Sequence, residues 1–481
     1  MSKVAEAILR YGQERSQYIA LSDETGAWTY TELAIGIAKF ETDLRALGIG
    51  KDRPVVVRLS NSAAWVVVDI AMAAAGYVSV PVPDFYTDEQ VLASAVDAGA
   101  GWIIRDADGA SDLMVLGRSL SIEALNAPKV RLHSGTAKIS YTSGSTGAPK
   151  GACLSVALQE KVAASIVERY GAEYAGTHVP VLSLGVLLEN TAGLYPVMLA
   201  GGHYKIIGAA ALGLENPFRP NFSAMRAALA RAGATSTILV PELLRGLMSR
   251  PEISLPAMRL IAVGGSKMAP ELVLAARLGG LPVFEGYGLT ECGSVVAVNA
   301  PGADRPGSCG KPLSHASVRI AEDGEVIVEG SLFLGYTGQP AQEDRLLTGD
   351  LGEIDDDGFL SITGRKKNLI ITSFGRNVSP EWVESALLLQ REFAQAVVLG
   401  DGEASLSALL VPSSPGVNKV AAQHAVDRAN AHLPAYARIG TFRMAPPLTP
   451  SSGLVTANGR PRRDAISILF KSLASQGEMT P

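Results

Sequence analysis

The sequence predicts an α/β protein with a large N-terminal domain of layered α/β subdomains and a small C-terminal α+β domain. Short β-branched runs alternate with alanine- and leucine-rich stretches, which is typical of parallel βαβ units. After about residue 310 the pattern changes to pairs of alternating strands. The chain has 481 residues, 47% of them hydrophobic and 19% charged, which indicates a globular protein with enough apolar residues for several cores.

Repeated strand–helix–strand segments account for the first part of the chain. The β-branched run 55–59 precedes a helical stretch over 62–75. Further strands are predicted at 78–82, 102–104, 236–240, 259–265 and 282–288, with helices over 88–98, 241–249 and 270–279. This spacing favours an open sheet of parallel strands with helices between them.

Two hairpins and a smaller region follow. Asp323-Gly324 and Asp357-Gly358 each lie between alternating strands, within 317–330 and 351–364, and Asp-Gly is a strong hairpin signal. Beyond them we expect strands at 369–373, 396–400 and 406–412 and helices over 380–390 and about 415–432. We place the domain boundary within 364–367, which gives domains 1–365 and 366–481.

Composition excludes several classes of protein. The net charge of −5 provides no broad basic field, so a nucleic-acid partner is not expected. The three cysteines and six histidines have no metal-ligand spacing, so no zinc site is expected. The odd number of cysteines makes a disulfide framework improbable and fits a reducing cytosol. The N-terminus lacks the features of a signal peptide. The apolar stretches 62–82 and 178–214 contain Asp69 and Glu189, respectively, so we expect a cytoplasmic protein with no membrane span.

The segment from Tyr141 to Gly151 is the strongest chemical signal. Its glycines allow backbone N–H groups to approach a ligand closely, and its hydroxyl groups suit phosphate oxygens. Lys150 adds a positive charge for the outer phosphates. The spacing differs from a Walker A loop, because Gly147 lies too close to the lysine and Gly151 follows it.

Two further segments contain groups suited to a nucleotide. In the run 285–291, Glu291 could hold Mg²⁺, Thr290 could donate to a phosphate and Tyr287 could stack on a base. Asp350, after a tight turn, could accept both hydroxyls of a ribose, and a basic run follows at 365–367. Taken alone, a solvated turn explains each of these segments about equally well.

Together and in this order, the segments resemble the adenylate-forming superfamily, which includes acyl-CoA synthetases, peptide-synthetase adenylation domains and firefly-type luciferases. The resemblance runs along nearly the whole chain. The segments that carry it are WTYTEL (28–33), AMAAAGYVSVPV (71–82), YTSGSTGAPKG (141–151), VGGS (263–266), GYGLTE (286–291), RPGSCGKPL (305–313), TGD (348–350), GRKK (364–367), GRNVSPEWVE (375–384) and NGRPRR (458–463).

The resemblance implies roles for individual residues. The β- and γ-phosphates of ATP would lie against Thr142, Ser143, Gly144, Ser145, Thr146, Gly147 and Lys150. The adenine would lie along Gly265, Ser266, Tyr287 and Gly288, and Asp350 and Arg365 would bind the ribose. Thr290 would contact the α-phosphate and Glu291 the magnesium. The C-terminal domain would be a mobile lid that rotates about Lys367, and Gly375 would face the pantetheine tunnel.

The sequence departs from the family pattern at two places. The usual C-terminal Gly-Lys pair is Gly459-Arg460 here, and arginine keeps the charge without the compact ammonium. The usual aromatic-His pair of the acyl pocket is also absent. Within the strand-like run 178–185 we place Leu182, Ser183 and Leu184 in the substrate pocket, which favours an aliphatic or fatty acid, although packing into the core explains the leucines equally well.

The resemblance therefore implies an AMP-forming acid–thiol ligase that uses ATP and Mg²⁺ and transfers the acyl group to CoA or to a phosphopantetheine. One alternative is an acyl-AMP ligase that loads a separate carrier protein. Another, motivated by Arg460, is a catalytically weak protein that binds acyl-adenylates. A luciferase-like oxygenase would share all of these motifs.

Overall fold

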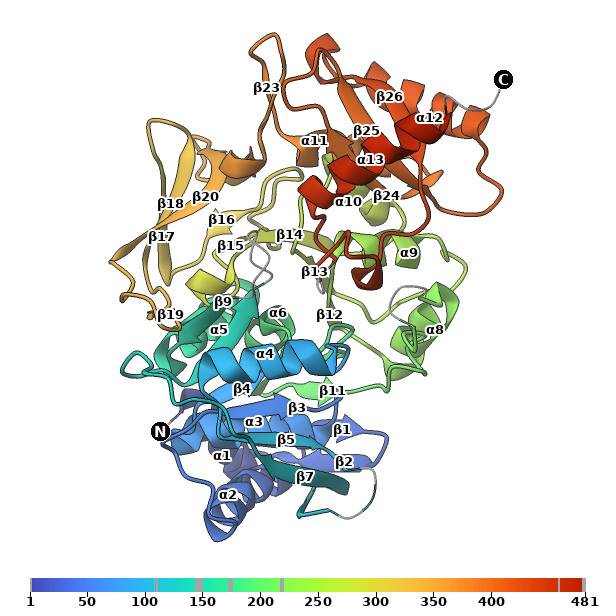
Figure 1. Cartoon of the computed structure of the whole chain (residues 1–481). Coiled ribbons are helices and arrows are strands. Elements are labelled where there is room, and N and C mark those ends of the chain that lie inside the picture. The colour runs from blue at the N-terminus through green and yellow to red at the C-terminus, as the bar shows by residue number, and fades with distance from the viewer. Residues whose placement is uncertain are drawn as a thin grey trace.

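The large N-terminal part of the molecule forms one body, and the small C-terminal domain lies at one end of it (Figure 1). The computed structural model describes residues 2–107, 109, 111–142, 150–171, 176–216, 220–456 and 459–477. The α/β fold class with a smaller α+β domain, expected from the sequence, is confirmed.

The first large sheet has the strand order β19-β9-β8-β4-β3-β5-β7-β6 among the described residues. Its strands are β3 (Val55–Arg58), β4 (Ser79–Pro81), β5 (Trp102–Asp106), β6 (Leu113–Val115), β7 (Arg118–Ala124), β8 (Lys138–Thr142), β9 (Lys150–Leu154) and β19 (Gly335–Tyr336). Helices α2 (Tyr30–Ala46), α3 (Ala63–Ala75) and α4 (Asp88–Ala98) belong to this part of the chain. The central strands β5, β3, β4 and β8 are parallel, as the alternating pattern predicts.

The second large sheet has the order β16-β15-β14-β13-β12-β10-β11-β1-β2 among the described residues. Its strands are β1 (Ile19–Asp23), β2 (Gly26–Thr29), β10 (Thr177–His178), β11 (His203–Lys205), β12 (Ser236–Leu239), β13 (Leu260–Val263), β14 (Val283–Tyr287), β15 (Ala297–Val298) and β16 (Lys311–Pro312). Its helical segments are α1 (Lys3–Glu14), α5 (Val156–Tyr170), α6 (Leu187–Glu189), the π-helix η2 (Asn190–Leu194), α7 (Tyr195–Ala200), α8 (Phe222–Ala232), α9 (Pro241–Met248), α10 (Pro270–Leu278) and η3 (Thr290–Cys292). Strands β12, β13 and β14 are parallel, so their carboxyl ends meet at one edge.

A four-stranded antiparallel sheet connects the large sheets to the small domain. It contains β17 (Ala316–Ile320), β18 (Glu325–Gly330), β20 (Arg345–Ile354) and β21 (Leu360–Arg365). Both Asp-Gly hairpins expected from the sequence are confirmed, because β17 pairs with β18 and β20 with β21. A 3-10 turn, η4 (Lys366–Asn368), follows directly.

The small domain packs helices against a three-stranded sheet of β24, β25 and β26. Its elements are β22 (Ile370–Ile371), β23 (Asn377–Val378), α11 (Pro380–Leu388), β24 (Phe393–Leu399), β25 (Leu406–Pro412), α12 (Lys419–Ala431), η5 (Ala435–Ala437), β26 (Ile439–Met444), η6 (Pro450–Ser452) and α13 (Arg463–Gly477). Strand β26 and helix α13 were not predicted from the sequence. The strand expected at 369–373 is reduced to the two residues of β22.

The strand expected over 178–185 is also shorter, because β10 ends at His178. Beyond it, the Asn61 side chain donates to the carbonyl of Leu182 at 2.8 Å and accepts from the N–H of Leu184 at 2.7 Å. These bonds occupy backbone groups that a neighbouring strand would otherwise pair. The chain therefore leaves the sheet before the acyl-pocket residues expected from the sequence.

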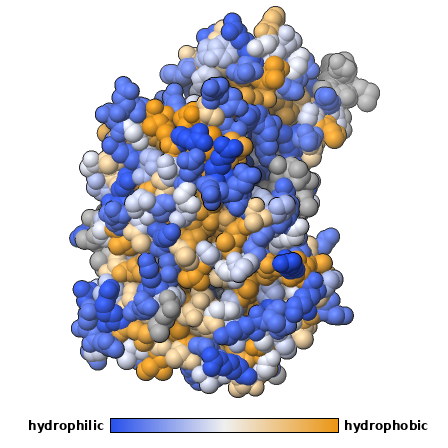
Figure 2. All heavy atoms as spheres, turned by 90° about the vertical axis from the view of Figure 1, so that its left-hand side faces the viewer, coloured by the Kyte–Doolittle hydropathy of each residue, from blue (hydrophilic) through white to orange (hydrophobic). Residues whose placement is uncertain are grey.

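The largest hydrophobic core contains buried residues from both large sheets and from the helices α2, α3 and α5. A separate core fills the small domain. On the face shown in Figure 2, hydrophilic and hydrophobic side chains alternate in small patches. Within the described residues, every helix is too short or too polar to cross a bilayer.

Candidate active site

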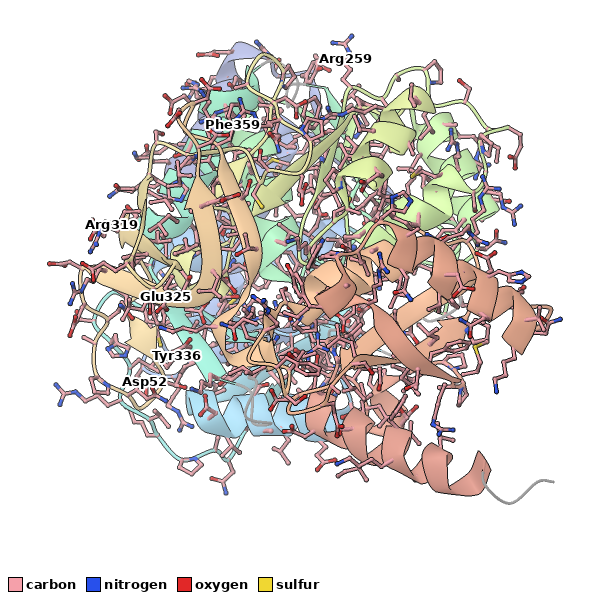
Figure 3. The ribbon with its side chains drawn as sticks, turned by 90° about the horizontal axis from the view of Figure 1, so that it is seen from above. Asp52, Arg259, Arg319, Glu325, Tyr336 and Phe359 are labelled. Atoms are coloured by element: carbon pink, nitrogen blue, oxygen red, sulfur yellow. The ribbon has the colours of Figure 1, made fainter. Side chains whose placement is uncertain are left out.

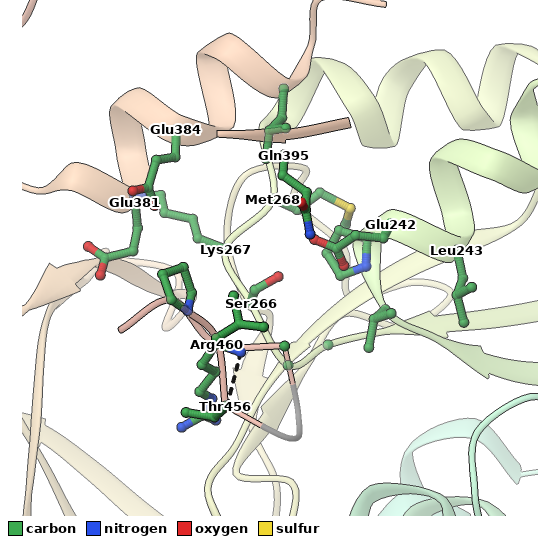
Figure 4. A pocket seen from close by; sticks show the side chains of 18 of the residues that line it. Glu242, Leu243, Ser266, Lys267, Met268, Glu381, Glu384, Gln395, Thr456 and Arg460 are labelled. Carbon is green, nitrogen blue, oxygen red and sulfur yellow. Dashed lines mark hydrogen bonds between the residues drawn. The ribbon is translucent and has the colours of Figure 1, made fainter. Parts of the chain in front are cut away.

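A cleft of about 4070 Å³ separates the carboxyl ends of β12, β13 and β14 from the small domain. Its walls include Ser266 of the large domain and Arg460 of the small domain, which Figure 4 shows in close-up. A volume of this size exceeds the several hundred cubic ångströms typical of a small-ligand pocket. The cleft therefore has room for a nucleotide together with a second substrate.

The base of the glycine-rich loop is held by strands β8 and β9. Tyr141 donates from its hydroxyl to Asp97 at 2.7 Å, and Thr337 donates to the same carboxylate oxygen at 2.5 Å. A side chain at Gly151 would lie only 2.8 Å from Ile139 and 3.0 Å from Thr337, so this close approach requires glycine. Lys150, at the end of the loop, lines the cleft.

Some of the expected phosphate-binding residues cannot be placed. Ser143, Gly144, Ser145, Thr146 and Gly147 lie outside the described residues, and for Thr142 only the backbone, at the end of β8, is described.

The run 286–291 brings Thr290 and Glu291 to the same cleft. A side chain at Gly288 would lie 1.6 Å from the carbonyl oxygen of Ser294, so the backbone can fold back here only at glycine. The short turn η3 then presents Glu291, whose Oε1 accepts a 2.5 Å hydrogen bond from the Tyr336 hydroxyl.

The donor set around Glu291 fits a magnesium ion that is bound together with phosphates. Mg²⁺ is typically held by one or two carboxylates, with phosphate oxygens and water completing its octahedron. Glu291 is half-buried and lines the cleft, and no cluster of three or more metal-ligating side chains exists within the described residues. One carboxylate at a phosphate site is what such an ion requires from the protein.

Asp350 is the centre of a second group of polar contacts. Its side chain is only 3% exposed, and a buried carboxylate needs partners. Arg365 lies 2.7 Å from one of its oxygens, and Tyr287 donates to the other at 2.7 Å. Burial, together with the charge of Asp350, raises the pKa of the Tyr287 phenol, which stays a donor. Strands β14, β20 and β21 thus bring three of the expected nucleotide-binding residues into contact.

Gly265 and Ser266 follow strand β13 and are exposed in the cleft. Beside them lies Glu285, which is 6% exposed and has an Oε2 with no hydrogen-bond partner within the described residues. Burial raises the pKa of Glu285 to about 8, although the nearby positive charge of Lys267 opposes this. Burial also lowers the pKa of the Lys267 ammonium.

Arg460 brings a positive charge from the small domain into the cleft. It lies on a turn in which its N–H donates to the Thr456 hydroxyl at 3.1 Å, as drawn in Figure 4. Its side chain is accessible from the cleft, but desolvation by the walls and the charge of Arg365 lower its pKa, while Glu291 and Asp350 act against this. Arg460 therefore lies within electrostatic range of both carboxylates.

Lys367 and Gly375 lie in different surroundings. Lys367 lines the cleft, and desolvation, followed by the charges of Arg365 and Arg460, lowers its pKa. Gly375 is an exposed residue between β22 and β23 and is not among the residues that line the cleft. In this arrangement the small domain presents Arg460, and not Gly375, to the residues expected to bind the nucleotide.

The three residues expected in the acyl pocket also separate. Leu182 and Ser183 are half-buried and line the cleft, whereas Leu184 is fully buried in the largest core. An apolar wall of the cleft instead comes from helix α5 and the second sheet. Its members are Ile166, Tyr170, Ile238, Ala262, Val295 and Val298.

Sequence reasoning missed three residues that touch or adjoin the expected site. Tyr336 contacts Glu291 although 45 positions separate them, and Lys267 and Glu285 adjoin the Gly265–Ser266 turn. Glu285 was visible as an acidic residue directly before the GYGLTE segment, and Lys267 as a basic residue after VGGS. Nothing local in the sequence marks Tyr336.

Comparisons with known proteins match both the large and the small domain of the chain. The family described as AMP-binding enzyme matches residues 9–337, and the family described as AMP-binding enzyme C-terminal domain matches residues 367–473. The long-chain-fatty-acid–CoA ligase FadD15 of Mycobacterium bovis is 29% identical over 474 residues, covering 80% of this chain and 78% of the relative.

Solved structures share the fold. The anthranilate CoA ligase AuaEII, in complex with anthranoyl-AMP, superposes with a TM-score of 0.84 at 18% identity over 98% of both chains. The o-succinylbenzoate CoA synthetase of Bacillus subtilis, in complex with ATP and magnesium ion, gives a TM-score of 0.77 at 24% identity, covering 95% of this chain and 98% of that one. At sequence identities below 25%, this structural similarity shows that the folds are alike and nothing about the substrate.

Proposed function

Because the chain belongs to the AMP-binding enzyme family, we propose that it is an AMP-forming acid–CoA ligase. It activates a carboxylic acid with ATP to an acyl-adenylate and pyrophosphate, and then transfers the acyl group to the thiol of CoA. The observation that carries this proposal is that Arg460, Glu291, Asp350 and Arg365 all line one cleft, which also has an apolar wall.

In the first half-reaction, a carboxylate oxygen of the acid attacks the α-phosphorus of ATP, and pyrophosphate leaves. Lys150 and the glycine-rich loop hold the β- and γ-phosphates, and Thr290 donates to the α-phosphate. Arg460 lines the cleft and is the cation that would attract both the acid and the α-phosphate. When bound at Glu291, Mg²⁺ neutralises phosphate charge. The chain's own work is mainly positioning and electrostatic stabilisation.

The rest of the nucleotide is held by the large domain. Asp350, fixed by Arg365 and Tyr287, accepts the ribose hydroxyls, and the adenine lies along Gly265 and Ser266. Glu285 is buried beside this turn and has an oxygen without a hydrogen-bond partner within the described residues. That oxygen suits the exocyclic amine of adenine.

The acid is an apolar one, aliphatic or fatty. Its hydrocarbon part lies against the wall formed by Ile166, Ile238 and Val298, whose side chains carry no charge. A second carboxylate in the substrate would need a cation to offset its desolvation, and these side chains supply none. The proposal therefore favours the substrate class of the fatty-acid relative over that of the succinylbenzoate enzyme.

The second half-reaction uses the other face of the small domain. Rotation about Lys367 would withdraw Arg460 from the cleft and bring the exposed Gly375 turn toward the acyl-adenylate. The pantetheine thiol of CoA would then attack the acyl carbon, and AMP would leave.

A second candidate function follows from Arg460. If a guanidinium cannot replace the family's lysine, the protein would bind acyl-adenylates without forming them. Transfer to a carrier protein, in place of CoA, is a variant of the main proposal that uses the same first half-reaction.

The proposal is tested by incubating the protein with ATP, Mg²⁺, CoA and one carboxylic acid at a time, and by identifying acyl-CoA and AMP by mass spectrometry. Acyl-CoA formed from apolar acids supports it. Acyl-AMP that accumulates without acyl-CoA indicates a carrier-protein acceptor. Acyl-CoA made only from a supplied acyl-AMP, and never from ATP and acid, indicates the adenylate-binding alternative.

A further inference from the structure

We propose that Tyr336 is a positioning residue that holds Glu291 and Lys150 apart and directs both toward the magnesium–nucleotide phosphates. This inference rests on the proposed function, since it concerns the same site. Strand β19 places Tyr336 beside β9, and Figure 3 shows Tyr336 toward the same side of the molecule as Glu325 of β18. No motif in the sequence pointed to this tyrosine.

The phenol contacts the carboxylate directly. The Tyr336 hydroxyl donates to Glu291 Oε1 at 2.5 Å, which fixes one oxygen of the carboxylate and its rotation. A tyrosine hydroxyl is protonated at neutral pH, so it remains a donor to the carboxylate. The second oxygen, Oε2, has no recorded hydrogen bond to any part of the chain that the structure describes.

The ring of the same tyrosine contacts the lysine. Lys150 Nζ lies 5.4 Å from the centroid of the Tyr336 ring, within the range of a cation–π interaction. Within the described residues, Lys150 and Glu291 each contact Tyr336, and no ion pair joins them directly. A direct ion pair would neutralise both groups before a nucleotide arrives. With the ring beside the ammonium and the hydroxyl on the carboxylate, each charge stays available.

Three contacts hold Tyr336 itself in place, and a fourth holds its neighbour in the chain. Its backbone pairs with Ala152 in β9, and its carbonyl accepts from the His133 ring at 3.0 Å. The Phe333 ring packs against it edge-on, with centroids 4.9 Å apart. The next residue, Thr337, donates to Asp97, which also holds Tyr141 at the base of the glycine-rich loop. The tyrosine is therefore fixed to the same strands that carry Lys150.

Two substitutions separate the two contacts. Tyr336→Phe removes only the hydrogen bond to Glu291 and keeps the ring beside Lys150. Tyr336→Leu removes both. Tyr11→Phe is the matched control, because Tyr11 is a half-buried tyrosine outside the cleft whose hydroxyl donates to the Leu199 carbonyl. Melting temperatures show whether each variant is folded.

The measurement is nucleotide binding by isothermal titration calorimetry, first with Mg²⁺ and ATP and then with ATP in excess EDTA. Binding of Mn²⁺ in the presence of ATP, followed by electron paramagnetic resonance, gives the metal affinity directly. For Tyr336→Phe we expect about ten-fold weaker binding of the metal–ATP complex, with metal-free ATP unchanged, because a hydrogen bond to a charged group is lost. Tyr336→Leu should in addition weaken metal-free ATP binding about two- to five-fold.

Two results would overturn the inference. One is wild-type metal dependence in the folded Tyr336→Phe variant. The other is an equal loss of metal-free and metal-bound ATP in both variants, which a purely structural role would give. Neither readout needs turnover. If no acid is activated but the metal-dependent split is found, the proposed function fails while the role of Tyr336 stands.

Discussion

The two sides of the cleft are built differently. On the large-domain side, Arg365 and Tyr287 each bind the Asp350 carboxylate at 2.7 Å, and the three residues come from strands of two different sheets. On the small-domain side, the backbone N–H of Arg460 donates to the hydroxyl of Thr456, which belongs to the same domain. The groups proposed to bind the nucleotide are thus held by one another, whereas Arg460 reaches the cleft only because of where the small domain lies.

This difference indicates that the two domains have different tasks. Binding of ATP should belong to the large domain, and the chemical step should depend on the small domain as well. Preorganised groups lower the cost of binding, and a group that arrives with a domain can be withdrawn after one half-reaction. The predictions that follow test this division from both sides of the cleft.

Replacing Glu291 should have the largest effect. Glu291→Ala should lower the adenylation rate about a thousand-fold, because a metal clamp contributes several kcal/mol of transition-state stabilisation. The measurement is acid-dependent ATP–pyrophosphate exchange at saturating Mg²⁺. Glu329→Ala, which removes an exposed glutamate paired with Arg319, is the matched control. A rate near that of wild type in Glu291→Ala would show that the magnesium site lies elsewhere.

Replacing Arg460 should separate the two half-reactions. Arg460→Ala should lower adenylation about a hundred-fold, since a charge that stabilises the transition state is lost, while ATP affinity and transfer from supplied acyl-AMP to CoA change little. Arg460→Lys should equal or exceed the wild-type rate. Pre-steady-state rates of the two half-reactions, with Arg428→Ala as a control on the same domain, distinguish these outcomes. A large loss in Arg460→Lys would mean that the site requires a guanidinium.

Replacing Asp350 should affect binding more than chemistry. Asp350→Asn leaves Arg365 without its carboxylate and should weaken ATP about ten- to thirty-fold, as expected for a hydrogen-bonded charge. Isothermal titration calorimetry measures this directly. Asp304→Asn is the control, because Asp304 also binds an arginine, Arg277, through both oxygens. An unchanged ATP affinity in Asp350→Asn would contradict the proposal that these residues of the large domain bind ATP.

Replacing Glu285 should have the smallest effect. This effect should appear in the stability of the protein, as a change in the pH dependence of its melting temperature. The pKa of this buried carboxyl is about 8 in the folded protein and near 4.5 when exposed. Between these values the folded state holds a proton that the unfolded state has lost, so the free energy of unfolding falls as pH rises through this window. Glu285→Gln should flatten the decline of Tm between pH 5 and pH 8 by about a few degrees. Identical slopes in both proteins would refute the raised pKa.

Much of the fold could be predicted from the sequence because the signals are local. Buried parallel strands read as β-branched runs, as in 55–59, and Asp-Gly turns marked both hairpins. The extent of β10 could not be predicted, because a side chain 121 positions away, Asn61, binds the backbone that would continue the strand. Strand β26 was missed because it forms by parallel pairing with β25 across an intervening helix.

The candidate site, like the fold, could be predicted only in part from the sequence. Its glycine-rich loop, GYGLTE and TGD segments are contiguous, and their residues could be proposed from chemistry and from the resemblance. Contacts between distant segments could not, such as Tyr336 with Glu291 or Lys267 beside Glu285. The surroundings of Arg460 also depend on how the two domains pack, which no local pattern encodes.

The central claim is that this cleft, with Arg460 in place of the family's lysine, activates an apolar carboxylic acid. The most direct test is carboxylate-dependent ATP–pyrophosphate exchange across a panel that runs from acetate through long-chain fatty acids to aryl and dicarboxylic acids. The account predicts exchange with the apolar aliphatic acids. If protein that still binds ATP shows no exchange with any acid of the panel, the central claim is contradicted.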